Sequence, residues 1–230
     1  MIGFWLQEVE REISFRTEQG LYYSYFKHLV KAPTLSQGIA ELRQDNLTEH
    51  TNTINIWKRF NIYQELFLAF LHRYFFHFME PILFYVEFVF NLQGFHAAML
   101  FLISWSLSGT WVSGVLTMAL LLVHRNEITR VPFTVPLREH FSLPFFYAMV
   151  VSIARHFKLC HHRMKNPPFW NSYQLSLVQV YLMTFLQLVT WQFAPFALLL
   201  HSIVCFVLAT LQMVAQKEVI FSWLKSVINM

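Results

Sequence analysis

The sequence PILFYVEFVFNLQGFHAAMLFLISWS, residues 81–106, decides the fold class of this chain. It holds a single charged residue, Glu87, and it is long enough to cross a hydrocarbon core of roughly 30 Å as a helix. Residues 107–123 follow almost without a break and are apolar enough to return through the same layer. Small residues at the join predict a tight reversal and close packing of the two helices; they are Ser106, Ser108, Gly109 and Gly114.

Three later apolar runs, at residues 141–154, 175–193 and 196–213, bring the expected number of transmembrane helices to about five. The loop at 155–172 holds four basic residues and no acidic one, which is typical of a cytoplasmic loop; they are Arg155, Lys158, Arg163 and Lys165. Counting from that loop places residues 124–140 and residues 1–80 together on the opposite side. The chain is therefore predicted to be all-α and multi-span, with a transmembrane helical region at 81–215 and a C-terminal tail at 216–230.

Residues 1–80 are predicted to form a loop region with interfacial amphipathic helices. Apolar residues recur there at near-helical spacing, at Phe60, Tyr63, Phe67, Phe70, Leu71 and Tyr74. This stripe fits an interfacial helix lying against the bilayer, and it fits an ordinary buried helix face equally well. The same region contains Asn46-Leu47-Thr48, the only N-glycosylation triplet of the sequence, so Asn46 is a candidate glycosylation site.

The composition agrees with a membrane protein and excludes other classes. Hydrophobic residues make up 56% and charged residues 13% of the 230 positions, which leaves too little polar surface for a soluble fold of this size. Basic residues are scattered between apolar runs, so no groove for a nucleic acid is expected. Cys160 and Cys205 suggest neither a disulfide framework nor a metal site, and no signal-peptide pattern is visible at the N-terminus.

Charged residues beside the first span mark a candidate site. The first loop supplies Glu12, Arg16 and Glu18, and a helix there would place Glu12 and Arg16 one turn apart. The second loop on the same side supplies Arg130, Arg138 and Glu139. Arginine suits bidentate binding of phosphate and a carboxylate suits proton transfer, so these residues fit a site for a lipid-linked phosphosugar at the membrane surface. Composition alone favours a simpler interpretation, in which they are ion pairs that close surface loops.

Other polar residues are weaker candidates. The pair His161-His162 resembles a metal pair, but adjacent residues on a helix point in different directions, so a solvated pair is the better interpretation. His96, His201 and Glu87 lie inside expected spans, where polar groups are functional suspects but also pack between helices. Three tyrosines are expected to form either a wall for an indole or, preferably, an aromatic belt at the membrane surface; they are Tyr22, Tyr23 and Tyr25.

Several dispersed motifs in one order carry a family resemblance. They are REISFRTEQGLYYSYFK (residues 11–27), KAPTL (31–35), NLTEHTNTIN (46–55), NIYQE (61–65), SWSLSGTWVSG (104–114), TRVPFTVPLREHFSLPFF (129–146) and VTWQF (189–193). From about residue 8 onward the chain resembles the dumpy-nineteen family of tryptophan C-mannosyltransferases. The resemblance implies a partial C-type glycosyltransferase fold, with residues 1–80 in the lumen of the endoplasmic reticulum.

The resemblance also implies a reaction and its participants. Mannose would pass from dolichyl-phosphate-mannose to C2 of tryptophan in WxxW-type sequences of unfolded secretory polypeptides, without a metal or other cofactor. Glu12 matches the family's acidic residue beside the acceptor and is the expected general base, with Glu18 as second choice. Arg16, Arg130, Arg138 and Glu139 are the expected donor-binding residues.

From the family pattern we expect a leader and a first span before residue 8 and about twice as many spans, which the given residues do not show. The alternatives are therefore a catalytically silent membrane fragment or interaction protein and, more remotely, a transporter-like bundle.

Overall fold

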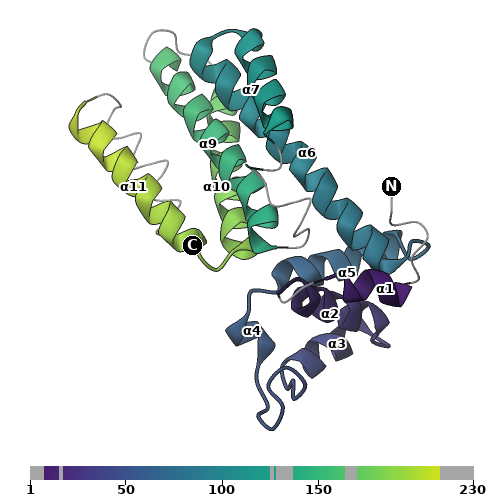
Figure 1. Cartoon of the computed structure of the whole chain (residues 1–230). Helices are drawn as coiled ribbons and strands as arrows, with labels where there is room; N and C mark the ends of the chain where they lie inside the picture. Colours follow the sequence, from purple (N-terminus) through teal and green to yellow (C-terminus); the bar gives the residue numbers. More distant parts are fainter. Residues whose placement is uncertain (1–7, 16–17, 125–126, 128–136, 164–169, 213–230) are drawn as a thin grey trace. The chain divides into compact units, whose positions relative to one another are not determined.

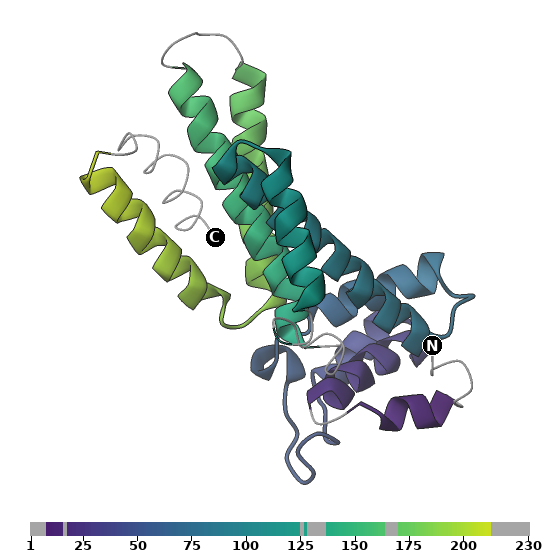
Figure 2. The same ribbon diagram turned by 45° about the horizontal axis from the view of Figure 1, so that its top comes forward.

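The computed structural model describes residues 8–15, 18–124, 127, 137–163 and 170–212, and all regular elements within these ranges are helices (Figure 1). Their bounds are α1 (Glu8–Ile13), α2 (Glu18–Lys31), α3 (Leu35–Leu42), α4 (Ile56–Arg59), α5 (Tyr63–Phe75), α6 (Pro81–Ser108), α7 (Trp111–Val123), α9 (Arg138–Arg163), α10 (Trp170–Thr190) and α11 (Ala194–Thr210). The chain separates into a first unit, Met1–Gly94 with His124–Phe141, and a second unit, Phe95–Val123 with Ser142–Met230. Figure 2 shows the same helices from another direction. The all-α prediction is confirmed.

Aromatic side chains fill the core of the first unit. Phe26 of α2 is fully buried, and its ring lies 4.9 Å from that of Tyr85 on α6, measured between centroids. Tyr22, Tyr23 and Tyr25 are at most 7% exposed, because α2 packs against α5 and turns these positions inward. The expectation of an aromatic belt or an indole wall at these tyrosines was therefore wrong, since they are core residues.

Helix α5 has two contrasting faces. Glu65, Leu68, Ala69 and His72 are buried, at the three- and four-residue spacing of one helix face. Four residues of the aromatic stripe predicted from the sequence remain exposed, since Tyr63, Phe67, Phe70 and Tyr74 are 43–62% exposed. The other two, Phe60 and Leu71, are partly buried and pack against the core. An ordinary buried face is thus the wrong interpretation of the stripe, since the buried face is a different one. Exposure to a bilayer stays a prediction.

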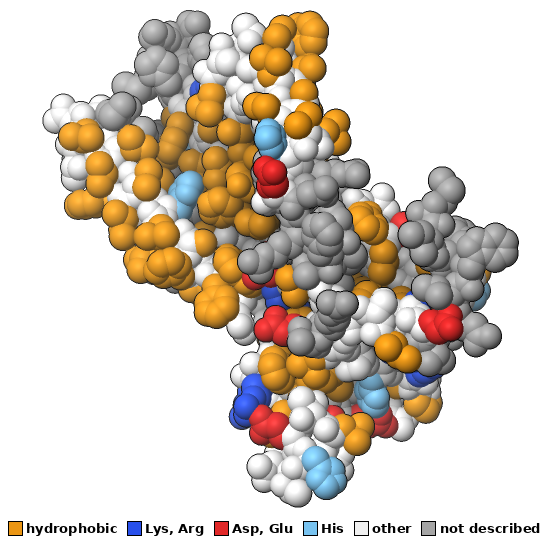
Figure 3. All heavy atoms as spheres, in the orientation of Figure 1, with side chains coloured by type: hydrophobic (Ala, Val, Ile, Leu, Met, Phe, Trp, Pro, Cys, Tyr) orange, Lys and Arg blue, Asp and Glu red, His pale blue; other side chains and the backbone are white. Residues whose placement is uncertain are grey.

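Five helices occur where membrane spans were expected, but only two of those in the described residues are long and apolar enough to cross a membrane. They are Pro81–Ser108 and the part of α9 at Arg138–Cys160. A core helix of a soluble protein can be equally long and apolar, but such a helix is mostly buried. Only 6% of the most apolar window of α6 is buried within the molecule, so α6 is not a helix of that kind. Helices α7 and α11 are apolar but shorter, and α10 does not meet the criterion. The number of five spans is not confirmed, although hydrophobic side chains predominate on the visible face of α11 (Figure 3).

The turn between α6 and α7 confirms the predicted tight reversal. Gly109 has φ of 77°, a conformation that favours glycine. A Cβ added at Gly114 would lie only 2.5 Å from Cε2 of Phe101, so this position allows the two helices to approach closely. The Thr117 hydroxyl donates to Oγ of Ser104 at 2.8 Å and joins the same pair of helices.

Candidate functional site

The first unit contains a buried ion pair between residues that are far apart in sequence. Nη1 of Arg138, in the first turn of α9, lies 2.9 and 2.7 Å from the two carboxylate oxygens of Glu65 on α5. Glu65 is fully buried and Arg138 is 6% exposed. The expected boundary at residue 141 was wrong, because α9 begins at Arg138 and holds this residue on a helix rather than on a loop.

Two tyrosines complete the surroundings of this pair. The Tyr85 hydroxyl of α6 donates to Oε1 of Glu65 at 3.0 Å. The ring of Tyr22 lies under the guanidinium, with Cζ of Arg138 3.6 Å from the ring centroid, which is cation–π geometry. Glu65, Arg138, Tyr85 and Tyr22 are called the Arg138 cluster below.

Burial and the paired charge act in opposite directions on the Glu65 carboxyl. Burial raises the pKa of the Glu65 carboxyl above its ordinary value, while the charge of Arg138 acts in the opposite direction. Removing one partner of such a pair costs about 3–5 kcal/mol, because the other charge stays buried and uncompensated. Nη2 of Arg138 is also buried, and it has no hydrogen-bond partner among the described residues. Nη2 is thus an unused donor at a place from which water is largely excluded.

Glu12 belongs to a second pair in the same unit. Its carboxylate on α1 accepts from Nζ of Lys27 on α2, at 2.5 and 2.6 Å, and from the Tyr23 hydroxyl at 3.2 Å. The Glu12 side chain is 22% exposed, so it is held in place and still reaches solvent. Tyr23 packs edge-on against Tyr85, with centroids 5.7 Å apart, and thereby connects this pair to the Arg138 cluster.

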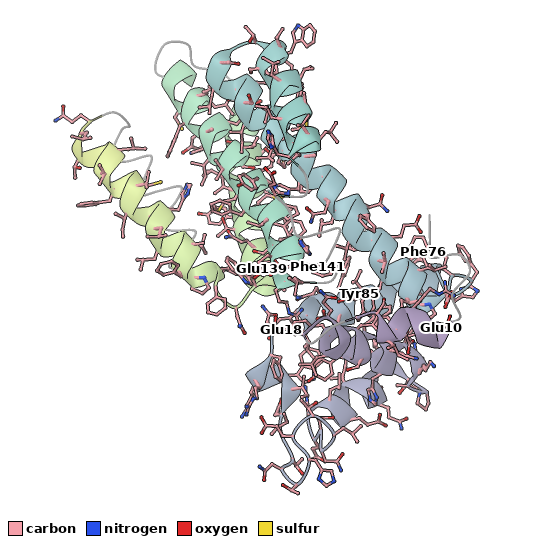
Figure 4. The ribbon with its side chains drawn as sticks, viewed as in Figure 1. Glu10, Glu18, Phe76, Tyr85, Glu139 and Phe141 are labelled. Atoms are coloured by element: carbon pink, nitrogen blue, oxygen red, sulfur yellow. The ribbon has the colours of Figure 1, made fainter. Side chains whose placement is uncertain are left out.

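The other predicted site residues are only partly placed. Glu18 is exposed at the first position of α2, and Glu139 is exposed in the first turn of α9. In Figure 4 these two residues lie on one side of Tyr85 and Glu10 lies on the other. Arg16 and Arg130 lie outside the described residues. The structure thus brings Glu12 and Arg138 into one unit, each paired with a residue that the sequence analysis did not select.

Those unselected residues are Lys27, Glu65 and Tyr85. A signal for Glu65 was present, because it is the one carboxylate on the face of α5 that also carries Leu68, Ala69 and His72. The aromatic stripe on the opposite face gave a more obvious signal and obscured this one. Lys27 and Tyr85 gave no such signal, since their roles depend on how α1, α2, α5 and α6 pack.

Asn46 is exposed, as a glycan acceptor must be. Within its triplet, the backbone N–H of Thr48 donates to Oδ2 of Asp45 at 2.9 Å, and the Thr48 hydroxyl lies 3.1 Å from that of Tyr25. Glycosylation at Asn46 stays a prediction.

The weaker candidates have structural surroundings. The ring of His96 stacks on that of Tyr147 at 4.9 Å, and His201 meets Phe146 edge-on at 6.3 Å, as expected for packing between helices. Across the ranges that are described, no group of three or more His, Cys, Asp or Glu could hold a metal ion. The side chains of His161 and His162 are not among those that the structure describes.

Comparison with known proteins gives one consistent result. A family model described as Dpy19, Q-cell neuroblast polarisation, matches residues 4–230. The human protein named probable C-mannosyltransferase DPY19L4 is 34% identical over 212 residues, which are 90% of this chain and 28% of the relative. Mouse protein C-mannosyl-transferase DPY19L1 is 34% identical over 223 residues, 84% of this chain and 29% of the relative.

A third relative, C-mannosyltransferase dpy-19 of Caenorhabditis elegans, is 33% identical over 220 residues, 84% of this chain and 31% of the relative. The chain therefore spans 28–31% of the length of these three relatives.

Proposed function

The chain belongs to the Dpy19 family, and from this premise we propose that it is a protein C-mannosyltransferase of the endoplasmic reticulum membrane. The names of its relatives imply a sugar donor and a protein acceptor. The proposed donor is dolichyl-phosphate-mannose. The proposed acceptor is C2 of a tryptophan in a WxxW-type sequence of an unfolded secretory polypeptide.

The proposed reaction needs a general base and a cationic group that stabilises the negative charge of the leaving phosphate. C2 of the indole attacks the anomeric carbon, a carbon–carbon bond forms, and the bond from that carbon to the phosphate oxygen breaks. Dolichyl phosphate leaves with the electron pair, and the indole becomes a cation that still carries the C2 proton. A carboxylate beside the ring stabilises this cation and then removes the proton, which restores the aromatic indole.

Glu12 is the proposed base because its carboxylate is fixed by two donors and yet partly exposed. Glu18 is the second choice, since it is exposed and no ion pair holds it among the described residues. Arg138 is the proposed contact to the leaving phosphate, through the buried Nη2 that has no partner in the described part of the chain. Arg16, Arg130 and Glu139 remain proposed donor-binding residues.

The membrane position of the site is part of the proposal. Helix α5 ends at Phe75 and the candidate span α6 begins at Pro81, so the end of α5 lies close to the start of a candidate span. Aromatic side chains are enriched at the interface between lipid and water, which suits the exposed stripe of α5. We infer that α5 lies on the bilayer surface, with the stripe toward lipid and Glu65 toward the protein.

The observation that carries the proposal is the family match across residues 4–230, and mannose transfer to a WxxW peptide in microsomes tests it. Glu12→Gln in a full-length family protein containing this chain should abolish transfer. Lys27→Gln breaks the same ion pair but leaves the carboxylate, so it should retain most of the transfer. Glu41→Gln is the matched control, because Glu41 forms an exposed pair with His28 in the same unit.

Three outcomes would count against the proposal. Equal losses of transfer in Glu12→Gln and Lys27→Gln, matched by equal losses of thermal stability, would show that the ion pair matters for structure and that Glu12 is not the base. Full activity in Glu12→Gln with loss in Glu18→Gln would move the base to Glu18. Transfer by the full-length protein but none by this chain alone would identify the chain as a catalytically silent fragment.

A further inference from the structure

We propose that Glu65 is a positioning residue that, with Tyr22 and Tyr85, fixes the Arg138 guanidinium so that Nη2 can bind a phosphate oxygen of the lipid-linked donor. This inference rests on the proposed function and adds residues that neither the sequence motifs nor the relatives' names assign. Glu65 does not touch the donor in this proposal. It acts through Arg138.

The geometry fixes the guanidinium in two independent ways. Nη1 alone contacts both oxygens of Glu65, so the pair defines how far Arg138 reaches and how it turns about its long axis. The Tyr22 ring covers one face of the guanidinium plane and defines its tilt. Because the guanidinium is rigid and planar, fixing one nitrogen and one face also fixes the direction in which the N–H groups of Nη2 point.

Glu65 is itself held by its surroundings. It lies on the buried face of α5, the helix that packs against α2, and its Oε1 accepts from the Tyr85 hydroxyl at 3.0 Å. The three residues around Arg138 therefore come from three different helices, Tyr22 from α2, Glu65 from α5 and Tyr85 from α6. A guanidinium held this way loses little further freedom when it binds an anion, which is the advantage of a preorganised site.

The unused Nη2 belongs to a pair whose side chains are only 7% and 0% exposed, whereas the unused Nε of Arg11 belongs to the Arg11–Glu80 pair, which is 19% and 24% exposed. A purely structural pair gains nothing from a buried donor without a partner, whereas a binding site needs such a donor before its ligand arrives. Apolar or neutral residues often replace a buried ion pair with no loss of stability. A structural role and a positioning role therefore predict different results when both charges are removed together.

Four variants in a full-length family protein containing this chain separate the two roles, with a polyprenyl-phosphate-mannose donor as the probe. Glu65→Gln should raise the KM for the donor by about tenfold to a hundredfold, with a smaller change in KM for the peptide. An effect of this size is typical when a residue that orients a binding group, without touching the ligand, is replaced. Tyr85→Phe removes only the hydroxyl that holds Glu65 and should act in the same direction more weakly. Arg138→Gln should lose donor binding. The double variant Glu65→Gln with Arg138→Gln should regain the thermal stability that either single variant loses, yet transfer mannose no better than Arg138→Gln.

Glu80→Gln is the matched control, because Glu80 pairs with Nη2 of Arg11 at 2.9 Å in the same unit. It should leave the KM for the donor unchanged. If the double variant regains transfer together with stability, or if Glu65→Gln lowers stability without changing the KM for the donor, the pair is structural and the inference is wrong. A wild-type protein that transfers no mannose would overturn the proposed function and this inference together, whereas the preceding outcomes overturn the inference alone.

Discussion

Replacing Gly114 with alanine should weaken the packing of α6 against α7. The added Cβ would lie 2.5, 2.6 and 2.9 Å from three carbons of the Phe101 ring, where carbon atoms normally rest roughly 3.5–4.0 Å apart. The ring or the helix must therefore move by about 1 Å. Moving the Phe101 ring also disturbs its contact with the ring of Trp105, whose centroid lies 6.0 Å away. Overpacking of this kind costs about 1–3 kcal/mol.

Gly94 provides the matched control for this substitution. It also lies inside a helix, but a Cβ added there would meet nothing within 4 Å in the described structure. Alanine gains about 0.8–1 kcal/mol over glycine from helix propensity at either position. That gain cancels in the difference between Gly94→Ala and Gly114→Ala, so the difference measures the clash alone.

The assay is unfolding in detergent micelles by titration with a denaturing detergent, followed by circular dichroism. Gly94→Ala should be neutral or stabilising, and Gly114→Ala should be less stable than Gly94→Ala by about 1–3 kcal/mol. Phe101→Leu, combined with Gly114→Ala, should recover part of the loss because the smaller side chain makes room. Equal stability of the two alanine variants would refute the close approach at Gly114.

Two further predictions concern the first unit. Arg73→Met should destabilise it by about 2–4 kcal/mol, because Nη1 and Nη2 of Arg73 donate to backbone carbonyls at and just beyond the end of α2, and hydrogen bonds to charged groups are worth more than neutral ones. Thermal unfolding checks this, and Arg59→Met is the control, since the exposed pair of Arg59 with Glu49 should contribute at most about 1 kcal/mol. Translation in microsomes should add one glycan, which Asn46→Gln removes; a properly inserted chain without the glycan would place residues 1–80 in the cytosol and separate Glu12 from a luminal donor.

Hydropathy predicted the helices well because it depends on residues close together in sequence. The apolar run at 81–106 became α6 at Pro81–Ser108, and the small residues after it became the observed turn at Gly109. The number and the length of the membrane-spanning helices were less predictable from the sequence. The α10 helix forms where a span was expected, but α10 does not satisfy the apolar criterion that α6 satisfies.

The candidate site was less predictable because its contacts join distant parts of the chain. Arg138 was selected from the sequence as a candidate site residue, but its partner Glu65 lies 73 residues earlier and was not selected. Likewise, Glu12 pairs with Lys27, fifteen residues later and on another helix, while Arg16, one helical turn away, lies outside the described residues. Charge spacing predicts pairs within a helix, and here tertiary packing determines the pairs that are observed.

Helix α5 has one face that carries a buried carboxylate and another that carries exposed aromatic residues. A helix places residues 65, 68, 69 and 72 on one face, so a carboxylate at position 65 is carried inward by the apolar neighbours that bury the same face. Aromatic residues on the opposite face cannot join that core and remain exposed. If lipid covers them, the depth of α5 in the interface also sets the depth of Glu65, and through Glu65 that of the Arg138 guanidinium. A phosphate carried by a membrane lipid would then meet its binding group at the level of the lipid headgroups.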